Sequence, residues 1–273
     1  MITPQIIELW PDGVPNAIES NTEEHILMEG SRKISQVINP TIEIHLPSGD
    51  NSIGVGLLIC PGGGYARLAY DKEGTDVAKF LNGRGMAAFV LKNRLPDEAT
   101  NEIPHESPLM DAKRAMELIR DKSQNWNLNK IGVMGFSAGG HLASTLATKF
   151  DAKNRPDFMG LIYPVITMKK DYAHKGSRER LIGDDAPEDL EILYSNELQV
   201  KENTPPAFII HSMDDDDVPV ENSFQFASAL RKKNVPVELH IYPEGGHGYG
   251  LGLSFKRLAD WPILMTRWIG DLK

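Results

Sequence analysis

The strongest chemical signal in the sequence is a serine between two glycines, in the segment Gly135-Phe136-Ser137-Ala138-Gly139. The segment fits the pattern G-x-S-x-G, and it joins an apolar run over residues 131–134 to a helical run of small residues. A strand-to-helix turn this sharp imposes strained dihedral angles on the serine and lifts its hydroxyl clear of the sheet. In this context Ser137 is predicted to be a nucleophile, not an incidental serine in a glycine-rich turn.

A serine hydroxyl is a weak nucleophile, so it needs a base and a group that orients the base. After a G-x-S-x-G turn of this kind, the acid and then the histidine follow along the chain. Two expected strands supply them: residues 212–219 follow one and contain four aspartates, and residues 243–248 follow the other and contain His247. Catalytic groups gather beyond the carboxyl ends of such strands.

Spacing alone does not choose among the four aspartates, which are Asp214, Asp215, Asp216 and Asp217. Most of them are expected to form a solvated acidic loop. A calcium loop is excluded because the required glycine and the distal glutamate are missing at their offsets. We therefore expect no metal ion and no cofactor.

Among the histidines, His247 is the best candidate for the base, because Gly245, Gly246 and Gly248 make its loop adaptable. His141 stands four residues after Ser137 on the expected helix, a rigid placement that favours packing or a supporting contact. His211 ends a strand and is expected to hydrogen-bond the acidic loop.

A third element is Pro61-Gly62-Gly63-Gly64-Tyr65, directly after the apolar run that ends at Cys60. Consecutive glycines can present free backbone N–H groups to a negatively charged oxygen. The amides of Gly63, Gly64 and Ala138 are predicted to form an oxyanion hole. A phosphate-binding loop is excluded, since no Gly-Lys-Ser/Thr completes it.

The elements that must position these residues are apolar runs alternating with helical patterns. Runs that are apolar without alternation are typical of parallel strands covered by helices on both faces. The expected strands are Thr41–Leu46, Gly54–Cys60, Met86–Leu91, Ile131–Phe136, Gly160–Val165, Ala207–His211 and Val237–Tyr242. This order predicts an α/β fold with one mostly parallel central sheet.

Helices are expected between these strands. Ser107-Pro108 offers a start signal for one of them, and apolar residues from Leu258 to Leu272 form a stripe that should pack on the sheet. We expect one domain over residues 1–273, with an irregular lead-in over 1–40. Residues 168–203 are expected to form a small insertion that caps the active site.

Composition limits the partners. The 273 residues carry a net charge of −9, and no Lys/Arg cluster is long enough to bind along a phosphate backbone. We therefore do not expect nucleic acid as a partner. Cys60 is the one cysteine and should be buried, not reactive. No apolar run is long enough to span a membrane. Without a signal peptide at Met1 the protein is expected to be cytoplasmic, or exported if a leader has been removed.

Several motifs occur together in one order: the residues 61–65, Glu73-Gly74, Asp111 with Arg114-Ala115, 135–141, Tyr163-Pro164-Val165 and 245–248. From about Pro11 to the C-terminus the set resembles α/β hydrolases of the acetyl-xylan-esterase-like, or carbohydrate acetylesterase, group. In related hydrolases the acid lies in the pattern H-G-x-x-D-x-x-V-P, and this resemblance selects Asp215. Two positions depart from the related patterns: Pro61 replaces the usual histidine before the glycines, and Ser212 replaces a glycine.

The resemblance implies a serine carboxylic-ester hydrolase that removes acetyl groups from sugars or xylo-oligosaccharides through Ser137, Asp215 and His247. A serine peptidase or amidase of the prolyl-peptidase type is the alternative, although those enzymes usually carry a large additional domain. A hydrolase fold retained only for binding is a third hypothesis, which the presence of all three residues disfavours. The sequence leaves the oligomeric state open.

Overall fold

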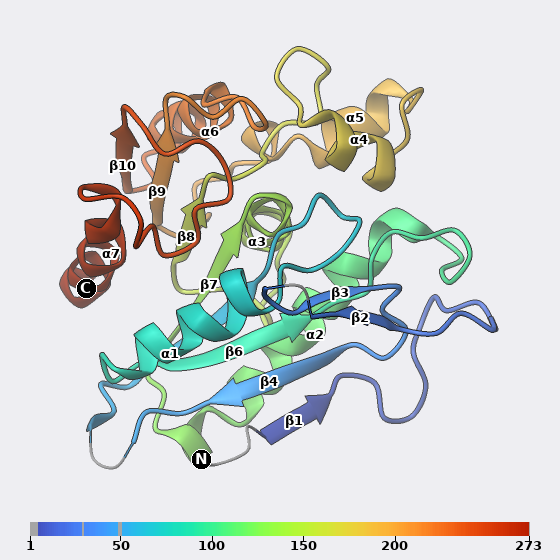
Figure 1. Ribbon diagram of the computed structural model, residues 1–273, viewed down its shortest axis with the longest axis horizontal. Helices are drawn as coiled ribbons and strands as arrows, with labels where there is room; N and C mark the ends of the chain where they lie inside the picture. Colours follow the sequence, from blue (N-terminus) through green and yellow to red (C-terminus); the bar gives the residue numbers. More distant parts are fainter. Residues whose placement is uncertain (1–4, 29, 49–50, 273) are drawn as a thin grey trace.

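The computed structural model describes residues 5–28, 30–48 and 51–272. Its centre is an eight-stranded sheet in the order β1-β4-β6-β5-β7-β8-β9-β10 (Figure 1). Six neighbouring strands, from β6 to β10 in that order, run parallel, whereas β4 pairs antiparallel with both β6 and β1. The mostly parallel sheet expected from the sequence is therefore present.

The strands of this sheet are β1 Gln5–Glu8, β4 Thr41–His45, β5 Val55–Cys60, β6 Ala87–Lys92, β7 Lys130–Phe136, β8 Met159–Ile162, β9 Ala207–Ser212 and β10 Val237–Tyr242. The larger helices are α1 Asp76–Asn82, α2 Ser107–Asp121, α3 Ala138–Thr148, α6 Glu221–Lys232 and α7 Trp261–Asp271. All seven predicted strands occur. The strand expected over Gly160–Val165 is shorter, since the backbone turns at Tyr163, where φ is 37°.

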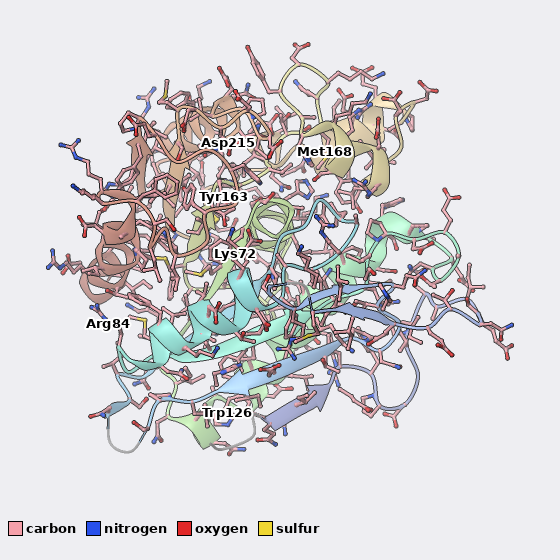
Figure 2. All side chains as sticks on the ribbon, viewed as in Figure 1. Lys72, Arg84, Trp126, Tyr163, Met168 and Asp215 are labelled. Carbon is pink, nitrogen blue, oxygen red and sulfur yellow. The ribbon has the colours of Figure 1, made fainter. Side chains whose placement is uncertain are left out.

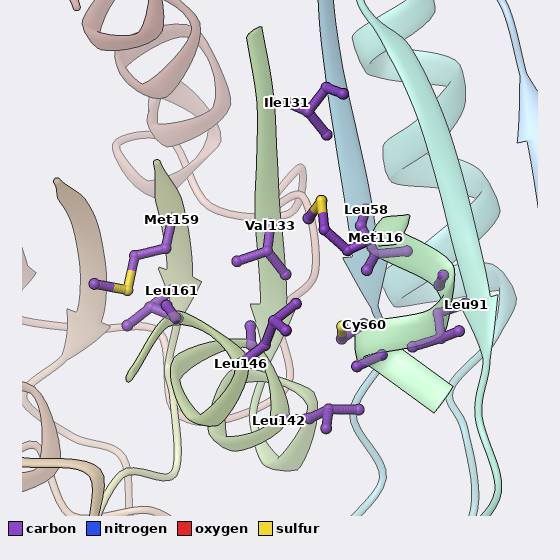
Figure 3. Close-up of a cluster of buried hydrophobic side chains, with 14 of the residues drawn as sticks. Leu58, Cys60, Leu91, Met116, Ile131, Val133, Leu142, Leu146, Met159 and Leu161 are labelled. Carbon is purple, nitrogen blue, oxygen red and sulfur yellow. The ribbon is translucent and has the colours of Figure 1, made fainter. Parts of the chain in front are cut away.

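Helices cover both faces of the sheet because alternate strand residues point to opposite sides. One buried cluster joins Leu58 of β5 to α2, α3 and α6. Figure 3 shows part of this cluster, with Leu142 and Leu146 of α3 beside Val133 of β7. A second cluster joins Leu57 to α1 and α7, and it contains Trp261 and Met265 of the expected C-terminal stripe. The predicted packing of that stripe is confirmed.

In the described part of residues 1–40 the structure has short strands, where the sequence predicts an irregular lead-in. They comprise β1, which adds an edge strand to the main sheet, and a small hairpin of β2 (His25–Leu27) and β3 (Lys33–Ser35). These strands have three or four residues, and Ile6 and Ile26 are exposed. Segments this short and this exposed carry too little periodic pattern to be recognised.

The segment expected as an insertion, 168–203, carries α4 Lys175–Leu181, α5 Glu188–Tyr194 and a 3₁₀ turn over Asn196–Leu198. In Figure 1 the two helices, in yellow, lie together above α3 in that view. A third buried cluster joins Leu181 and Tyr194 of this segment to Tyr65 and Ala138. The segment is thus packed onto the glycine turn and the start of α3.

Among the helices of the described residues, none has both the length and the apolar character needed to cross a bilayer. Cys60 is fully buried, as predicted, and burial raises the pKa of its thiol. A thiol in that setting is held in its protonated, unreactive form.

A buried ion pair connects the end of β6 to α2 and to the N-terminal segment. Arg94 Nη2 lies 2.8 Å from Asp111 Oδ1, and both side chains are essentially inaccessible. The indole of Trp10 donates to the same carboxylate at 2.8 Å, and Arg94 also donates to the carbonyl of Pro15. Asp111 therefore ties three segments that are distant in sequence.

Replacing Asp111 by alanine should lower the free energy of unfolding by about 3–5 kcal/mol, because it leaves the Arg94 guanidinium buried without a counter-charge. The measurement is urea denaturation followed by circular dichroism. Asp76→Ala is the matched control: its ion pair with Lys79 is exposed, and its loss should cost less than about 1 kcal/mol. Equal losses in the two variants would contradict the prediction.

Candidate active site

Ser137 occupies the turn between β7 and α3 in a strained conformation, with φ of 52° and ψ of −121°. The turn closes only because its flanking residues lack side chains. A Cβ at Gly135 would lie 2.1 Å from the carbonyl oxygen of Gly139, and a Cβ at Gly139 would lie 2.1 Å from that of Cys60. The expected close approach of strand and helix is confirmed.

The structure brings Ser137, His247 and Asp215 together. His247 Nε2 lies 2.8 Å from Ser137 Oγ, and His247 Nδ1 lies 2.7 Å from Asp215 Oδ2. An ionised carboxylate can only accept, so Nδ1 carries the proton and Nε2 is free to accept the serine proton. This is the tautomer that a general base needs.

Asp215 accepts four hydrogen bonds. Its Oδ2 accepts from His247 and from His211 Nε2 at 3.0 Å, while Oδ1 accepts from the amides of Val218 at 2.8 Å and Asp217 at 3.0 Å. Burial alone would raise the pKa of Asp215, but the bonds from His211, His247 and Val218 outweigh it and lower the pKa to about 2. The expected contact of His211 with the acidic loop is confirmed.

A neighbouring aspartate has a role that sequence reasoning missed. Asp214 is exposed, yet its carboxylate accepts from the amides of Gly246 at 2.8 Å and Gly245 at 3.2 Å. It therefore fixes the start of the loop that carries His247. Two adjacent aspartates thus act on the same loop, one through the backbone and one through the imidazole.

The turn after β5 lies beside Ser137 and carries the glycine amides. Among the described residues, no acceptor is found for the N–H groups of Gly63, Gly64 and Ala138. Gly63 and Gly64 have φ of 133° and 62°, values that favour glycine. The amide of Gly62 differs, since it donates to Glu73 Oε2 at 2.7 Å. The three predicted donors are thus not used by another bond in the described part of the chain.

His141 takes the supporting role expected of it. It is fully buried, donates from Nε2 to the carbonyl of Tyr194 at 2.8 Å, and accepts the hydroxyl of Tyr65 at Nδ1, also at 2.8 Å. Burial lowers its pKa to about 4. Both ring nitrogens are occupied, so His141 cannot serve Ser137 as a base.

Two further groups that the sequence did not reveal are Glu73 and Tyr163. Tyr163 is fully buried, and its hydroxyl donates to Glu73 Oε1 at 2.8 Å. Its ring meets the ring of His247 edge to face, with 4.9 Å between centroids. The presence of Glu73-Gly74 and Tyr163-Pro164-Val165 among the shared motifs was the available signal, but sequence alone could not pair them.

The part of the chain that the structure describes contains no group of three or more histidine, cysteine or acidic side chains placed to hold a metal ion. Ser137 is hydrogen-bonded to His247, and His247 to Asp215. The arrangement can transfer an acyl group through a serine ester.

Residues 99–268 match the prolyl oligopeptidase family. The chain is 39% identical over 216 residues to an acetylxylan esterase of Xylanibacter ruminicola, covering 77% of this chain. It is 42% identical over 207 residues to endo-1,4-beta-xylanase B of Butyrivibrio fibrisolvens, covering 70% of this chain. The matches take up 43% and 32% of those two relatives, so the chain spans less than half of their length.

Among solved structures, the acetyl ester-xyloside bifunctional hydrolase of Caldicellulosiruptor lactoaceticus is similar over nearly the whole chain. Its TM-score is 0.83 at 36% identity, and the match covers 98% of this chain and 97% of that one. The likeness includes both the central sheet and the segment 168–203, since so little of either chain lies outside it.

The four bonds to Asp215 predict a pH-dependent contribution to stability. A pKa lowered in the folded state adds stability that is fully present above pH 4 and is lost as the pH falls toward 2. The free energy of unfolding of Asp215→Asn should therefore be about 2 kcal/mol below that of the wild type at pH 6, with the gap closing as the pH falls from 4 toward 2.

Urea denaturation at intervals between pH 6 and pH 2.5 measures this gap. Asp216→Asn is the control, because Asp216 is an exposed neighbour in the same loop. Its difference from the wild type should stay constant with pH. A constant gap for Asp215→Asn would show that its carboxylate gains nothing from the four bonds.

Proposed function

The chain belongs to the prolyl oligopeptidase family of α/β hydrolases, and from this premise we propose that it is a serine esterase that removes acetyl groups from sugars or xylo-oligosaccharides. Family membership confirms the α/β-hydrolase fold and the hydrolase class expected from the sequence. The proposal adds the residues that act and the ester on which they act. The observation that carries it is the continuous relay from Ser137 Oγ through His247 to Asp215.

In the proposed reaction, Ser137 Oγ attacks the ester carbonyl as its proton passes to His247 Nε2. The tetrahedral oxygen accepts from the amides of Gly63, Gly64 and Ala138. The protonated imidazole then gives its proton to the leaving alcohol, which leaves an acetyl ester on Ser137. His247 then takes a proton from water as its oxygen attacks this ester, and it returns the proton to Ser137 Oγ as acetic acid leaves and ionises to acetate.

Asp215 keeps the imidazole in the required tautomer and stabilises the positive charge that it gains. Because Asp215 already accepts four hydrogen bonds, it stays ionised while His247 is charged. The N-terminus of α3 lies directly after Ser137 and favours the negative charge that develops there.

A cavity beside the glycine turn, lined in part by charged side chains, supports a sugar as the alcohol part of the ester. It has a volume of about 580 Å³ and lies between Tyr65, the loop 95–105 and α4. Besides Tyr65, the charged and titratable side chains that line it are Asp97, Glu98, His105, Glu179 and Arg180. Carboxylates accept from sugar hydroxyls and the guanidinium donates to them. The names of the relatives, acetylxylan esterase and acetyl ester-xyloside hydrolase, point to the same substrate class.

Ser137→Ala should lower kcat for 4-nitrophenyl acetate by at least about 10⁴-fold, because the acyl-enzyme can no longer form. Acetate release and nitrophenolate absorbance measure the rate, and a fluorophosphonate probe tests whether Ser137 is the labelled serine. Ser228→Ala on α6 is the control and should keep the wild-type rate. A Ser137→Ala variant with an unchanged rate would refute the proposed nucleophile.

Ala66→Trp should place a large ring in the cavity between Tyr65 and α4, since Ala66 is an exposed residue of its lining. We expect KM for acetylated xylo-oligosaccharides to rise about 10-fold or more, a loss of about 1.4 kcal/mol of binding. The kinetics with 4-nitrophenyl acetate should change less than about twofold. Ser228→Trp, which lines a separate cavity on α6, is the matched control. An equal effect on both substrates would contradict this placement of the sugar.

A peptidase is the second candidate, favoured by the match of residues 99–268 to the prolyl oligopeptidase family. The relay from Ser137 to Asp215 is equally suited to amides, so geometry at the serine does not separate the two reactions. Side-by-side turnover of 4-nitrophenyl acetate and of proline-containing peptide nitroanilides separates them. Higher kcat/KM on the peptides would favour the peptidase.

A further inference from the structure

A buried carboxylate connects the two loops that the proposed reaction needs. Glu73 lies in the turn of Asp71–Thr75 that leads into α1, and 4% of its surface is exposed. Its Oε2 accepts from the amide of Gly62 at 2.7 Å, and its Oε1 accepts from the hydroxyl of Tyr163 at 2.8 Å. Gly62 directly precedes the amides proposed to bind the oxyanion.

The same network continues to the loop of His247. The hydroxyl of Tyr163 accepts from the amide of Gly250 at 2.9 Å, three residues after His247. Trp261 Nε1 donates to the carbonyl of Gly250 at 3.1 Å, so both backbone polar groups of Gly250 are hydrogen-bonded. Figure 2 shows Tyr163 between Asp215 and Lys72 in that view, at the centre of the molecule. Glu73 is therefore joined to one loop directly and to the other through one tyrosine.

Close packing holds the acid in this position. A Cβ at Gly74 would lie 2.7 Å from Val90 of β6, so glycine lets the turn approach the sheet. A Cβ at Gly62 would lie 2.7 Å from Glu73 Oε2 and 2.9 Å from the Cβ of Ser137. Gly62 is thus enclosed between the acid and the serine. A shift of Glu73 would be transmitted to the glycine turn.

The hydrogen bonds indicate an ionised carboxylate. Both partners of Glu73 are donors, an N–H group and an O–H group, and an ionised carboxylate is the form that only accepts. The Tyr163 hydroxyl accepts from Gly250, so donating to Glu73 completes its own pattern. Burial favours the neutral form and raises the pKa of Glu73, while Tyr163, Gly62 and the nearby His247 oppose that effect.

We infer that Glu73 is a positioning residue of the proposed esterase: its buried negative charge holds the oxyanion turn and the His247 loop in register and favours the protonated imidazole. This inference rests on the proposed function, because it needs His247 to gain a proton during the reaction. Glu73 acts through Gly62 and Tyr163, without touching the substrate.

The other charged or titratable groups near His247 and its loop include Tyr163 against the imidazole, Asp214 and Asp215 after β9, and Lys72 beside Gly250. His174 lies before α4, with Asp217 and Arg180 beside it. Among them Glu73 has a distinct position. Its carboxylate is linked to His247 through Tyr163, whose ring packs against the imidazole, whereas Asp215 bonds Nδ1 directly. The two acids therefore make separable contributions.

Glu73→Gln tests the inference with a change that keeps the volume of the side chain. Glutamine has one oxygen for two donors, so either the Gly62 amide or the Tyr163 hydroxyl would face its NH2 group and lose an acceptor. We expect kcat for 4-nitrophenyl acetate to fall about 10- to 100-fold, the range for a hydrogen bond to a charged group. KM should stay within about threefold of the wild-type value.

The pH profile distinguishes positioning from a structural role. Loss of a negative charge near His247 disfavours its protonated form, so the acidic inflection of kcat/KM should move to lower pH. Rates are expressed per serine labelled by a fluorophosphonate, which removes the effect of unfolded protein. A variant with the wild-type rate per labelled serine, or with an unmoved inflection, would overturn the inference.

Two further variants complete the test. Tyr163→Phe removes the shared hydroxyl, and by itself it should lower kcat per labelled serine, a readout that does not require Glu73→Gln to fold. In the double variant Glu73→Gln/Tyr163→Phe, the fold-loss of kcat should be smaller than the product of the two single losses, because both substitutions break one network. Independent effects would overturn the inference. Asp157→Asn is the control: its carboxylate accepts the amide of Ile131 at the opposite end of β7, and its kcat per labelled serine should equal that of the wild type. An inactive wild type, by contrast, would count against the proposed esterase itself.

Discussion

The structure depends on one close contact, the approach of α3 to the end of β7 and to the neighbouring strand β5. Ser137 can adopt a φ of 52° only if the backbone on both sides is free of side chains. Gly135 and Gly139 meet that condition, each with a carbonyl oxygen where a Cβ would stand. Backbone hydrogen bonds stabilise this strained conformation. The amide of Ser137 donates to the carbonyl of Ile162, and the carbonyl of Ser137 accepts from the amide of Val165. The hydroxyl is therefore aimed by the fold, before any substrate arrives.

Three buried carboxylates organise what surrounds this contact, and each connects segments distant in sequence. Asp111 joins α2 to the end of β6 and to the N-terminal segment. Asp215 joins the loops after β9 and β10, and Glu73 joins the turn after β5 to the region after β8. A charge in the interior is costly unless it is fully bonded, so each acid selects one arrangement of its partners. Loops that would otherwise be adaptable are thereby fixed at the carboxyl edge of the sheet.

Sequence reasoning reached the central sheet and the turn that carries Ser137 because both rest on local patterns. Apolar runs of about six residues and a serine between glycines carry their own signal. The choice of Asp215 needed a family pattern, because four adjacent aspartates differ only in where their side chains point. Glu73, Tyr163 and Asp214 were out of reach for a different reason: their partners lie 11, 90 and at least 31 residues away. Short edge strands such as β1 were not predicted, because four residues are too few to show a periodic pattern.

The segment 168–203 is hydrogen-bonded to the glycine turn. Arg180 of α4 donates to the carbonyl of Gly64 at 3.2 Å, and the imidazole of His174 is close enough to contact a Cβ at that glycine. Arg180, which also lines the cavity beside Tyr65, is thus bonded to the peptide next to the proposed oxyanion donors. Substrate range and turnover would then evolve together in this protein, and a graft of another relative's insertion would have to carry its own partner for Gly64.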